Sequence, residues 1–402
     1  MYSIYIPSMA IKDGPNLDAF SRLRVSNPIG LFDSTFQYDL QTRIYWQDTA
    51  NGGTVSHTAA YSSSALVTAA QQSSMAAMQT KLYHRYIPAK SQLIVMTQVV
   101  GAAVTGVTKR VGYFDSNDGI FLSQTLSGLA FVRRSSTSGS PQEESVPQYL
   151  WDLDRLDGSG PSRIRFDVSK ASILVIDLQW LGMGRVRVGF DIGGQIVYAH
   201  EFLNANVLSV PYMRTANLPI RWEVSGNGVA TMYATCASVI SEGGAEFDRG
   251  YLAEKASGTV TAASGARTCI VAIRPKTTLN SIVNRLQITP DMFGAIVTGD
   301  IPVLWEVLYD PTISGGSWVS AGSDSAVEYN ITATSISAGT GVDAFFVPAL
   351  SSAVVTAAMD SAYRLPLVLD ISGSNPIALA LVATGIDGTS TCQGSITWRE
   401  LR

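Results

Sequence analysis

Alternating apolar and polar positions run through residues 92–240 and predict antiparallel β structure. Residues 92–114 are rich in β-branched and aromatic side chains, which favour strands. Residues 185–190 open with alternating Arg and Val, as a strand with one solvent-facing side does. The sequence SNDG at residues 116–119 and the pair Gly193-Gly194 are typical of hairpin turns. We therefore expect a sandwich of about 150–200 residues here.

The last third of the chain repeats a different pattern of short apolar runs, separated by Gly, Ser, Asp and Pro. No amphipathic helix of three turns is apparent between the runs, so we expect a second all-β sandwich or jelly roll. The runs cover residues 266–275, 281–289, 301–310, 326–336, 365–372 and 376–385.

Two stretches are less regular. Residues 59–80 are rich in Ala, Ser, Gln and Met, and their periodicity fits either a small-residue helix or a pair of strands with serine turns. Residues 240–246 are small and polar, which is typical of a linker. The predicted organisation is an N-terminal arm over residues 1–45, a β-sandwich domain over 46–242, and a C-terminal sandwich or jelly roll over 243–402.

Residues 18–39 form a polar segment that carries many large apolar side chains. Pro28 and Gly30 interrupt any helical or strand ladder, so we expect an extended arm. Its apolar residues need a surface to cover them, either in their own domain or on a neighbouring subunit. We expect the neighbouring subunit, with two arginines pairing at the rim of the groove. The predicted arm contacts are Phe20, Arg22, Leu23, Arg24, Leu31, Phe32 and Phe36.

Composition narrows the class of protein. Charged residues make up 15% of the chain, against about 25% in typical soluble domains, and the net charge is −4. The arginines are scattered, so we expect no nucleic-acid partner. No apolar run reaches 18 residues and the N-terminus lacks a signal-peptide pattern, so we expect no membrane partner and folding in a cytoplasm.

Candidate catalytic and metal sites are few. Only three histidines occur, and His200 is the only one beside a carboxylate, Glu201, which would point to the opposite face of a strand. Asp152, Asp154 and Asp157 have the wrong spacing for an EF-hand, so we expect Asx turns there rather than a bound ion. We expect no catalytic residue, no metal and no cofactor, because nothing in the sequence places two carboxylates across a sugar.

Sugar binding without cleavage has better candidates. Aromatic side chains on the loops of a sandwich can contact sugar rings, and aromatics with a polar edge suit wet surfaces. Trp318 lies beside two glycines and a serine, and Tyr329 lies further along the same region. We name Trp318 and Tyr329 as possible glycan contacts. The alternative for Trp318 is packing in the core.

Several motifs in fixed order carry a resemblance to a known family. They include DAFSRLRVSNPIGLFD at 18–33, YFDSNDGIF at 113–121, WLGMGRVRVGF at 180–190 and YAHEF at 198–202. This series, over roughly residues 15–225, resembles structural proteins of tailed bacteriophages and of some other large-genome viruses. The resemblance implies a virion component without enzymatic activity, and it assigns no catalytic residues.

The sequence and the resemblance together support three hypotheses. The first is a component of the phage tail, neck or fibre that assembles through the N-terminal arm. The second is a capsid surface or vertex protein, and the third is a host-adhesion protein that binds carbohydrate through residues 250–402. The expected partners are further copies of the chain, as a homotrimer according to the resemblance, other virion proteins, and a host-surface glycan. The expected location is the virion.

Overall fold

The computed structural model describes residues 17–18, 20, 27–243, 250–351, 354–358 and 365–402. Contacts divide the chain into two compact units, which are described separately below. The first unit holds residues 1–40, 47–78 and 86–245, and the second holds residues 41–46, 79–85 and 246–402. The domain boundaries predicted at residues 45 and 242 stay predictions.

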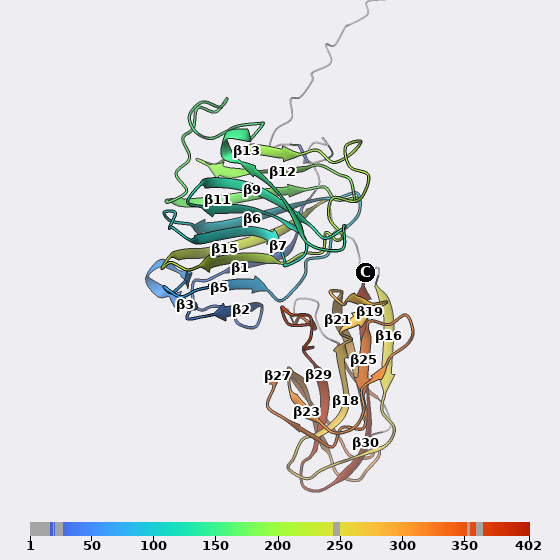
Figure 1. Cartoon of the computed structure of the whole chain (residues 1–402). Helices are drawn as coiled ribbons and strands as arrows, with labels where there is room; N and C mark the ends of the chain where they lie inside the picture. The colour runs from blue at the N-terminus through green and yellow to red at the C-terminus, as the bar shows by residue number, and fades with distance from the viewer. Residues whose placement is uncertain (1–16, 19, 21–26, 244–249, 352–353, 359–364) are drawn as a thin grey trace, which may run out of the picture. The chain divides into compact units, whose positions relative to one another are not determined.

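The predicted all-β fold class is confirmed. The described residues form antiparallel sheets in a jelly-roll-like arrangement, with two short 3₁₀ turns at Ala59–Tyr61 and Gln148–Leu150 and no α-helix among them (Figure 1). Within this described part, no helix has the length and hydropathy that crossing a bilayer takes.

The first unit contains a sheet that we call the β6 sheet. Its strand order is β13-β12-β11-β6-β15-β4-β3, and β1 also pairs with β15. The strands are β1 (Ile29–Thr35), β3 (Thr54–Thr58), β4 (Ser63–Val67), β6 (Ser91–Val99), β11 (Ala171–Leu178), β12 (Val186–Ile192), β13 (Gln195–Phe202) and β15 (Thr231–Glu242).

The second layer of this unit, the β7 sheet, has the order β10-β9-β8-β7-β14-β5-β2. Its strands are β2 (Tyr45–Ala50), β5 (Ser74–Thr80), β7 (Val107–Phe114), β8 (Gly119–Thr125), β9 (Gly128–Ser135), β10 (Gln142–Pro147) and β14 (Ile220–Gly226). The predicted turn at 116–119 joins β7 to β8, and Gly193-Gly194, both with positive φ, joins β12 to β13.

Side chains alternate between the inside and the outside of this sandwich. In β12 the side chains of Val186, Val188 and Phe190 are fully buried. They lie on the inner face, because a strand directs successive side chains to opposite faces. Arg187 therefore lies on the outer face of the β6 sheet, where the pairing of β11 with β12 places Asp177 beside it. Burial of apolar area at about 25 cal/mol per Å² stabilises the inner face.

The prediction of an irregular segment over residues 18–39 is wrong for part of that run. Residues Ile29–Thr35 form β1, antiparallel to β15. Pro28 stands just before the first strand residue, where its missing N–H removes no ladder hydrogen bond. The register shifts between Gly30 and Phe32, so an irregularity in the pairing accommodates the glycine without ending the strand.

The predicted role of Phe32 and Phe36 as contacts to another subunit is corrected as well. Both side chains are buried within their own unit, and Phe36 packs edge-on against Trp222 with ring centroids 5.9 Å apart. Their own sandwich covers them because β1 continues the alternation of the β6 sheet. Leu31 and Phe20 are half-buried, whereas Arg22, Leu23 and Arg24 lie outside the described residues.

Residues 59–80 form two strands rather than a helix. The strands β4 and β5 belong to opposite sheets, and the Ser64 hydroxyl contacts the Met78 sulfur across the sandwich at 2.7 Å. Small side chains allow this close approach of the two layers.

The second unit contains a sheet with the order β16-β30-β21-β28, to which β17 adds beside β30, and a β29 sheet with the order β24-β25-β18-β29-β22-β27. The strands of the first are β16 (Tyr251–Ala256), β17 (Val260–Ala262), β21 (Gln287–Val297), β28 (Val355–Ala358) and β30 (Ser390–Leu401). Those of the β29 sheet are β18 (Thr268–Pro275), β22 (Val303–Tyr309), β24 (Val319–Ser320), β25 (Val327–Asn330), β27 (Thr340–Val347) and β29 (Leu379–Gly385).

Two small ribbons complete the second unit. They are β19 (Thr278–Leu279) with β20 (Ile282–Val283), and β23 (Thr312–Ser314) with β26 (Ser335–Ser337). Side chains of the second ribbon, Ile313 and Ile336, pack with Trp318 against a small apolar cluster that includes Leu308 and Ala380. This cluster is separate from the main core around Trp305 and Trp398, so the outer face of the β29 sheet is partly covered.

Candidate functional site

An irregularity in β13 decides which side chains share the outer face of the β6 sheet. The register shifts so that Val188 pairs with His200 while Gly189 pairs with Tyr198, which leaves Ala199 as an extra residue. Gly189 is required here, because a Cβ atom would lie 2.1 Å from the Val197 carbonyl oxygen. Tyr198 and Glu201 therefore lie on the outer face with Arg187.

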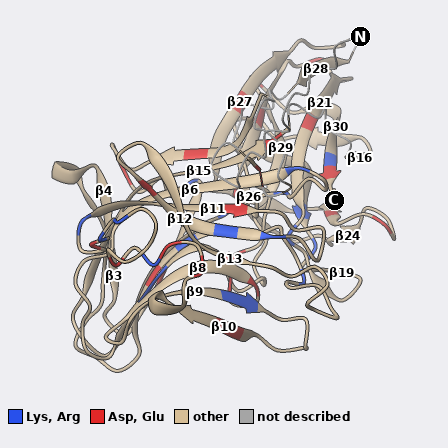
Figure 2. Ribbon diagram, turned by 90° about the horizontal axis from the view of Figure 1, so that it is seen from above, with Lys and Arg blue, Asp and Glu red and all other residues tan. Residues whose placement is uncertain are grey.

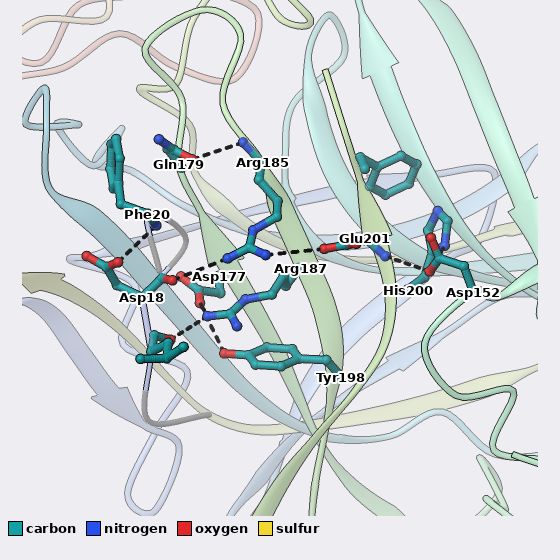
Figure 3. Close-up of polar contacts among 12 residues, drawn as sticks. Asp18, Phe20, Asp152, Asp177, Gln179, Arg185, Arg187, Tyr198, His200 and Glu201 are labelled. Atoms are coloured by element: carbon teal, nitrogen blue, oxygen red, sulfur yellow. Dashed lines mark hydrogen bonds and ion pairs between the residues drawn. The ribbon is translucent and has the colours of Figure 1, made fainter. Parts of the chain in front are cut away.

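A buried ion pair occupies the centre of this face (Figure 3). Arg187 Nη2 donates to Asp177 Oδ2 at 2.5 Å, and both side chains are almost fully buried. Asp177 also accepts hydrogen bonds from the Tyr198 hydroxyl at 3.1 Å and from the Ser91 hydroxyl at 2.6 Å. The guanidinium carbon of Arg187 lies 4.2 Å from the centre of the Tyr198 ring. Each charge is thus paired and hydrogen-bonded, as burial requires.

Residues from the N-terminal segment cover this pair. Arg187 donates to the Leu17 carbonyl oxygen, and Arg185 donates to the Asp18 carbonyl oxygen at 3.5 Å while it also pairs with Glu201 at 3.5 Å. The Asp18 carboxylate in turn accepts the Phe20 amide at 2.9 Å. Leu17 and Asp18 are themselves buried. The outer face of β11–β13 is therefore a docking surface for the chain's own backbone.

A histidine–aspartate pair lies beside this face. His200 Nδ1 is 2.8 Å from Asp152 Oδ1, which also accepts the Glu201 amide. Burial alone would raise the pKa of Asp152, but the hydrogen bond and charge of His200 and the Glu201 amide lower it below its ordinary value. Sequence spacing does not reveal this pair, because its members are 48 residues apart.

Asp154 and Asp157 form Asx turns, as predicted, whereas Asp152 instead bonds to His200 and to the Glu201 amide. Asp154 accepts the amides of Leu156 and Ser162, and Asp157 accepts the amide and hydroxyl of Ser159. Among the described residues, no group of three His, Cys, Asp or Glu side chains is arranged to hold a metal ion.

Charged residues elsewhere are scattered among uncharged ones along the ribbon (Figure 2). Many of them pair across strands. Glu143 in β10 binds Arg134 in β9 at 2.6 Å, and Arg267 binds Glu306 through Nε at 2.9 Å and through Nη2 at 2.7 Å. In the Arg267 pair both carboxylate oxygens are engaged by one guanidinium, which is the usual two-point geometry of a surface pair.

The two predicted glycan contacts lie on opposite faces of the β29 sheet. Tyr329 faces inward in β25 and packs against the main core, with the Lys255 ammonium 4.4 Å from its ring centre. Trp318 is half-buried against the outer apolar cluster. Because the two side chains point to different faces, they do not line one site, and only Trp318 belongs to the outer surface considered below.

Trp318 contacts one member of a charged pair, Arg274 with Glu328, that sequence reasoning missed. Arg274 in β18 is in register with Glu328 in β25, and its Nε donates to Glu328 Oε1 at 2.6 Å. The guanidinium carbon of Arg274 lies 3.9 Å from the centre of the Trp318 ring. Alternation within each strand could have assigned both residues to one face, but their separation by 54 residues hides the register. We call Arg274, Trp318 and Glu328 the Trp318 patch.

Some hydrogen-bond donors of the Trp318 patch remain available to a ligand. In the part of the chain that the structure describes, the terminal amino groups of Arg274 and the indole N–H of Trp318 donate to no protein atom. The Arg274 side chain is 29% exposed and the Glu328 side chain 22% exposed. The patch therefore offers donors and a carboxylate to a molecule in solution.

Comparison with known proteins gives matches in structure alone. No protein-family model matches the chain, and no curated protein matches its sequence. A family 16 glycoside hydrolase, an endo-glucanase from Bacteroides ovatus, is similar at 10% identity over 52% of this chain and 99% of its own, with a TM-score of 0.35.

Carbohydrate-binding folds are also among the solved structures that match. A legume lectin-like domain from Entamoeba histolytica is 10% identical over 52% of this chain and 97% of its own, with a TM-score of 0.31. The CBM2 module of an evolved Dit from Lactobacillus casei BL23 phage J-1 is 10% identical over 55% of this chain and 99% of its own, with a TM-score of 0.32. At these TM-scores the likenesses assign no site to this chain.

The prediction that the protein is not an enzyme is contradicted by these matches, because glycoside hydrolases stand among them. We withdraw it. The prediction rested on the resemblance to virion proteins without enzymatic activity and on the lack of any sequence signal that brings two carboxylates together. Spacing along the sequence does not report strand register, which here places Asp177 and Glu201 on either side of Arg187 on one face.

Proposed function

We propose that the protein binds carbohydrate through the outer face of the β29 sheet in its second unit. The observation that carries this proposal is the Trp318 patch, in which a half-buried indole lies against Arg274, which is paired with Glu328 and whose terminal nitrogens donate to no atom of the described residues. The proposed ligand-binding surface lies within residues 250–402.

The chemistry of the patch suits a sugar. A sugar ring presents hydroxyl groups that both donate and accept hydrogen bonds, together with apolar C–H groups. Binding sites for such molecules combine aromatic surface with a few fixed polar groups. Here Trp318 supplies the aromatic surface, Arg274 supplies donors, and Glu328 supplies an acceptor. The strand register holds Arg274 beside Glu328, so little ordering remains to be done on binding.

We further propose a virus particle as the setting. The series of motifs over residues 15–225 supports this part of the proposal, as does an N-terminal segment held on the first sandwich through Leu17 and Asp18. In this setting the first unit would belong to the particle and the second would contact a surface glycan. Homotrimerisation and other virion partners are included in this proposal.

The test is a glycan array probed with the full chain, with Trp318→Ala and with Tyr251→Ala. Tyr251 is a matched control, because it is an exposed ring with a guanidinium 4.4 Å from its centre, that of Arg402, in the same unit. We expect one glycan class to bind, with binding lost in Trp318→Ala and kept in Tyr251→Ala. Absence of binding by the full chain, or equal binding by all three proteins, would overturn the proposal.

The same oligosaccharides, chromatographed before and after incubation, report whether any bound sugar is also cleaved. Shorter products that persist in Trp318→Ala would place a hydrolytic site away from the Trp318 patch.

A further inference from the structure

We propose that the sugar bound at the Trp318 patch carries a carboxylate, and that Arg274 is the residue that takes it. This inference rests on the proposed function and narrows it from carbohydrates in general to acidic ones, such as those containing uronic or sialic acids. The unoccupied half of the Arg274 guanidinium is the observation behind it.

Arg274 uses one edge of its guanidinium and leaves another open. Its Nε donates to Glu328 at 2.6 Å, whereas neither terminal nitrogen donates to an atom of the described protein. Those two nitrogens form a fork whose spacing matches the two oxygens of a carboxylate, so a bidentate pair is the contact that best fits them. A neutral hydroxyl would use only one arm of the fork.

The surface pair of Arg267 and Glu306, in the same unit, is an example of an arginine whose role is to pair with a carboxylate of its own chain. Arg267 engages Glu306 through Nε and Nη2 together, so both carboxylate oxygens are taken. Arg274 makes contact with Glu328 through Nε alone. Its position is set instead by Trp318, whose ring centre lies 3.9 Å from the guanidinium carbon. The two terminal nitrogens of Arg274 are thus held in position but donate to no atom of the described protein.

The charge of the patch also favours an acidic ligand. Glu328 offsets part of the Arg274 charge, but a ligand carboxylate that meets the fork from the open edge approaches the cation rather than the glutamate. A charge-assisted hydrogen bond is worth roughly twice a neutral one. We therefore expect acidic oligosaccharides to bind about tenfold or more tightly than their neutral counterparts, which is about 1.4 kcal/mol.

The experiment pairs each acidic oligosaccharide with its neutral version. Uronate oligosaccharides are compared with the same chains after carboxyl reduction, sialylated oligosaccharides with the desialylated ones, and sulfated oligosaccharides with the desulfated ones. Each is titrated by calorimetry into the full chain, Arg274→Gln, Arg274→Lys and Arg267→Gln. The last variant removes the same charge from the same unit, and circular dichroism verifies that all four proteins are folded.

Carboxylated members should bind at least about tenfold more tightly than their neutral partners. That preference should vanish in Arg274→Gln, weaken in Arg274→Lys, which keeps the charge but loses the fork, and persist in Arg267→Gln. Equal binding of acidic and neutral members would overturn this inference and leave carbohydrate binding intact. A preference for sulfated sugars alone, or an acidic preference kept in Arg274→Gln, would also overturn it. Absence of any binding would remove both proposals.

Discussion

The outer face of the β6 sheet and the outer face of the β29 sheet carry the same three kinds of group with opposite outcomes. In the first unit Arg187, Asp177 and Tyr198 combine a guanidinium, a carboxylate and an aromatic ring. In the second unit the Trp318 patch combines the same three. The guanidinium carbon is 4.2 Å from the ring centre in one and 3.9 Å in the other.

The two clusters differ in what covers their arginine side chains. Arg187 is buried under Leu17, whose carbonyl oxygen accepts from its Nη2, and Asp177 accepts hydrogen bonds from Arg187, Tyr198 and Ser91. Arg274 is 29% exposed, and among the described residues its guanidinium donates a hydrogen bond to Glu328 alone. The same three kinds of group therefore form a structural joint where backbone covers them, and they form the binding surface that we propose where solvent reaches them. Coverage, rather than residue type, decides which role such a cluster has.

The largest loss of stability should come from breaking the buried pair of Arg187 and Asp177. Asp177→Asn leaves Arg187 buried beside a neutral amide, so we expect the free energy of unfolding to fall by about 3–5 kcal/mol. The matched change at the exposed pair, Glu328→Gln, should cost no more than about 1 kcal/mol. Urea unfolding of each full-length variant, followed by tryptophan fluorescence, measures both. Equal losses in the two variants would contradict the comparison.

A smaller loss of stability is expected from a change at Tyr198, the aromatic partner of the buried pair. Tyr198→Phe removes the hydroxyl that donates to Asp177 at 3.1 Å, and a hydrogen bond to a buried charge contributes about 1.5–3 kcal/mol. Urea unfolding should show a loss in this range. A variant as stable as the parent protein would mean that the Ser91 and Arg187 hydrogen bonds alone satisfy Asp177.

Low pH should lower the stability of the protein through another buried group, His84 in the second unit. Burial lowers the pKa of His84 from its ordinary 6.5 to about 3. The folded protein thus keeps this imidazole neutral while the unfolded chain takes up a proton below pH 6.5. Stability is fully present above that pH and is lost as the pH falls toward 3, by about 2 kcal/mol at pH 5.

The measurement is urea unfolding of the full chain and of His84→Gln between pH 7 and 5. The variant should show a weaker pH dependence than the parent protein over this range. Parallel pH profiles would show that other groups cause the acid sensitivity. In NMR spectra the His84 ring protons should keep their neutral shifts down to about pH 4.

The smallest stability effect should come from Trp318→Phe. The side chain is half-buried and its N–H has no partner among the described residues, so the change should alter the free energy of unfolding by about 0.5 kcal/mol or less. Thermal unfolding tests this expectation. A loss of several kcal/mol would make Trp318 a core residue and would weaken the case for a binding surface.

Local patterns in the sequence predicted the fold class well, and they failed where partners are far apart. Alternation predicted the strands, and the turn residues at 116–119 and 193–194 predicted two hairpins. Pro28 and Gly30 misled the prediction for residues 29–35, because their effect depends on where a strand begins and where its pairing shifts. Small residues at 59–80 left helix and strand equally open until packing between the two sheets resolved them.

The candidate sites followed the same rule. Trp318 could be selected from the sequence because its glycine and serine neighbours mark an exposed segment. Arg274 and Glu328 could not, since only the pairing of β18 with β25 brings them to it. The closure of Arg187 by Leu17 spans 170 residues, and no periodicity in the sequence reports such a contact.

The most direct test of the central claim observes Trp318 itself while ligand binds. The full chain, with its seven tryptophans replaced by 5-fluorotryptophan, gives fluorine NMR signals, and the Trp318 signal is assigned by its absence in Trp318→Phe. On titration with the tightest-binding array glycan, the account predicts that the Trp318 signal shifts with saturation while the signals of buried Trp222, Trp305 and Trp398 stay in place. An unmoved Trp318 signal at saturating glycan would contradict it.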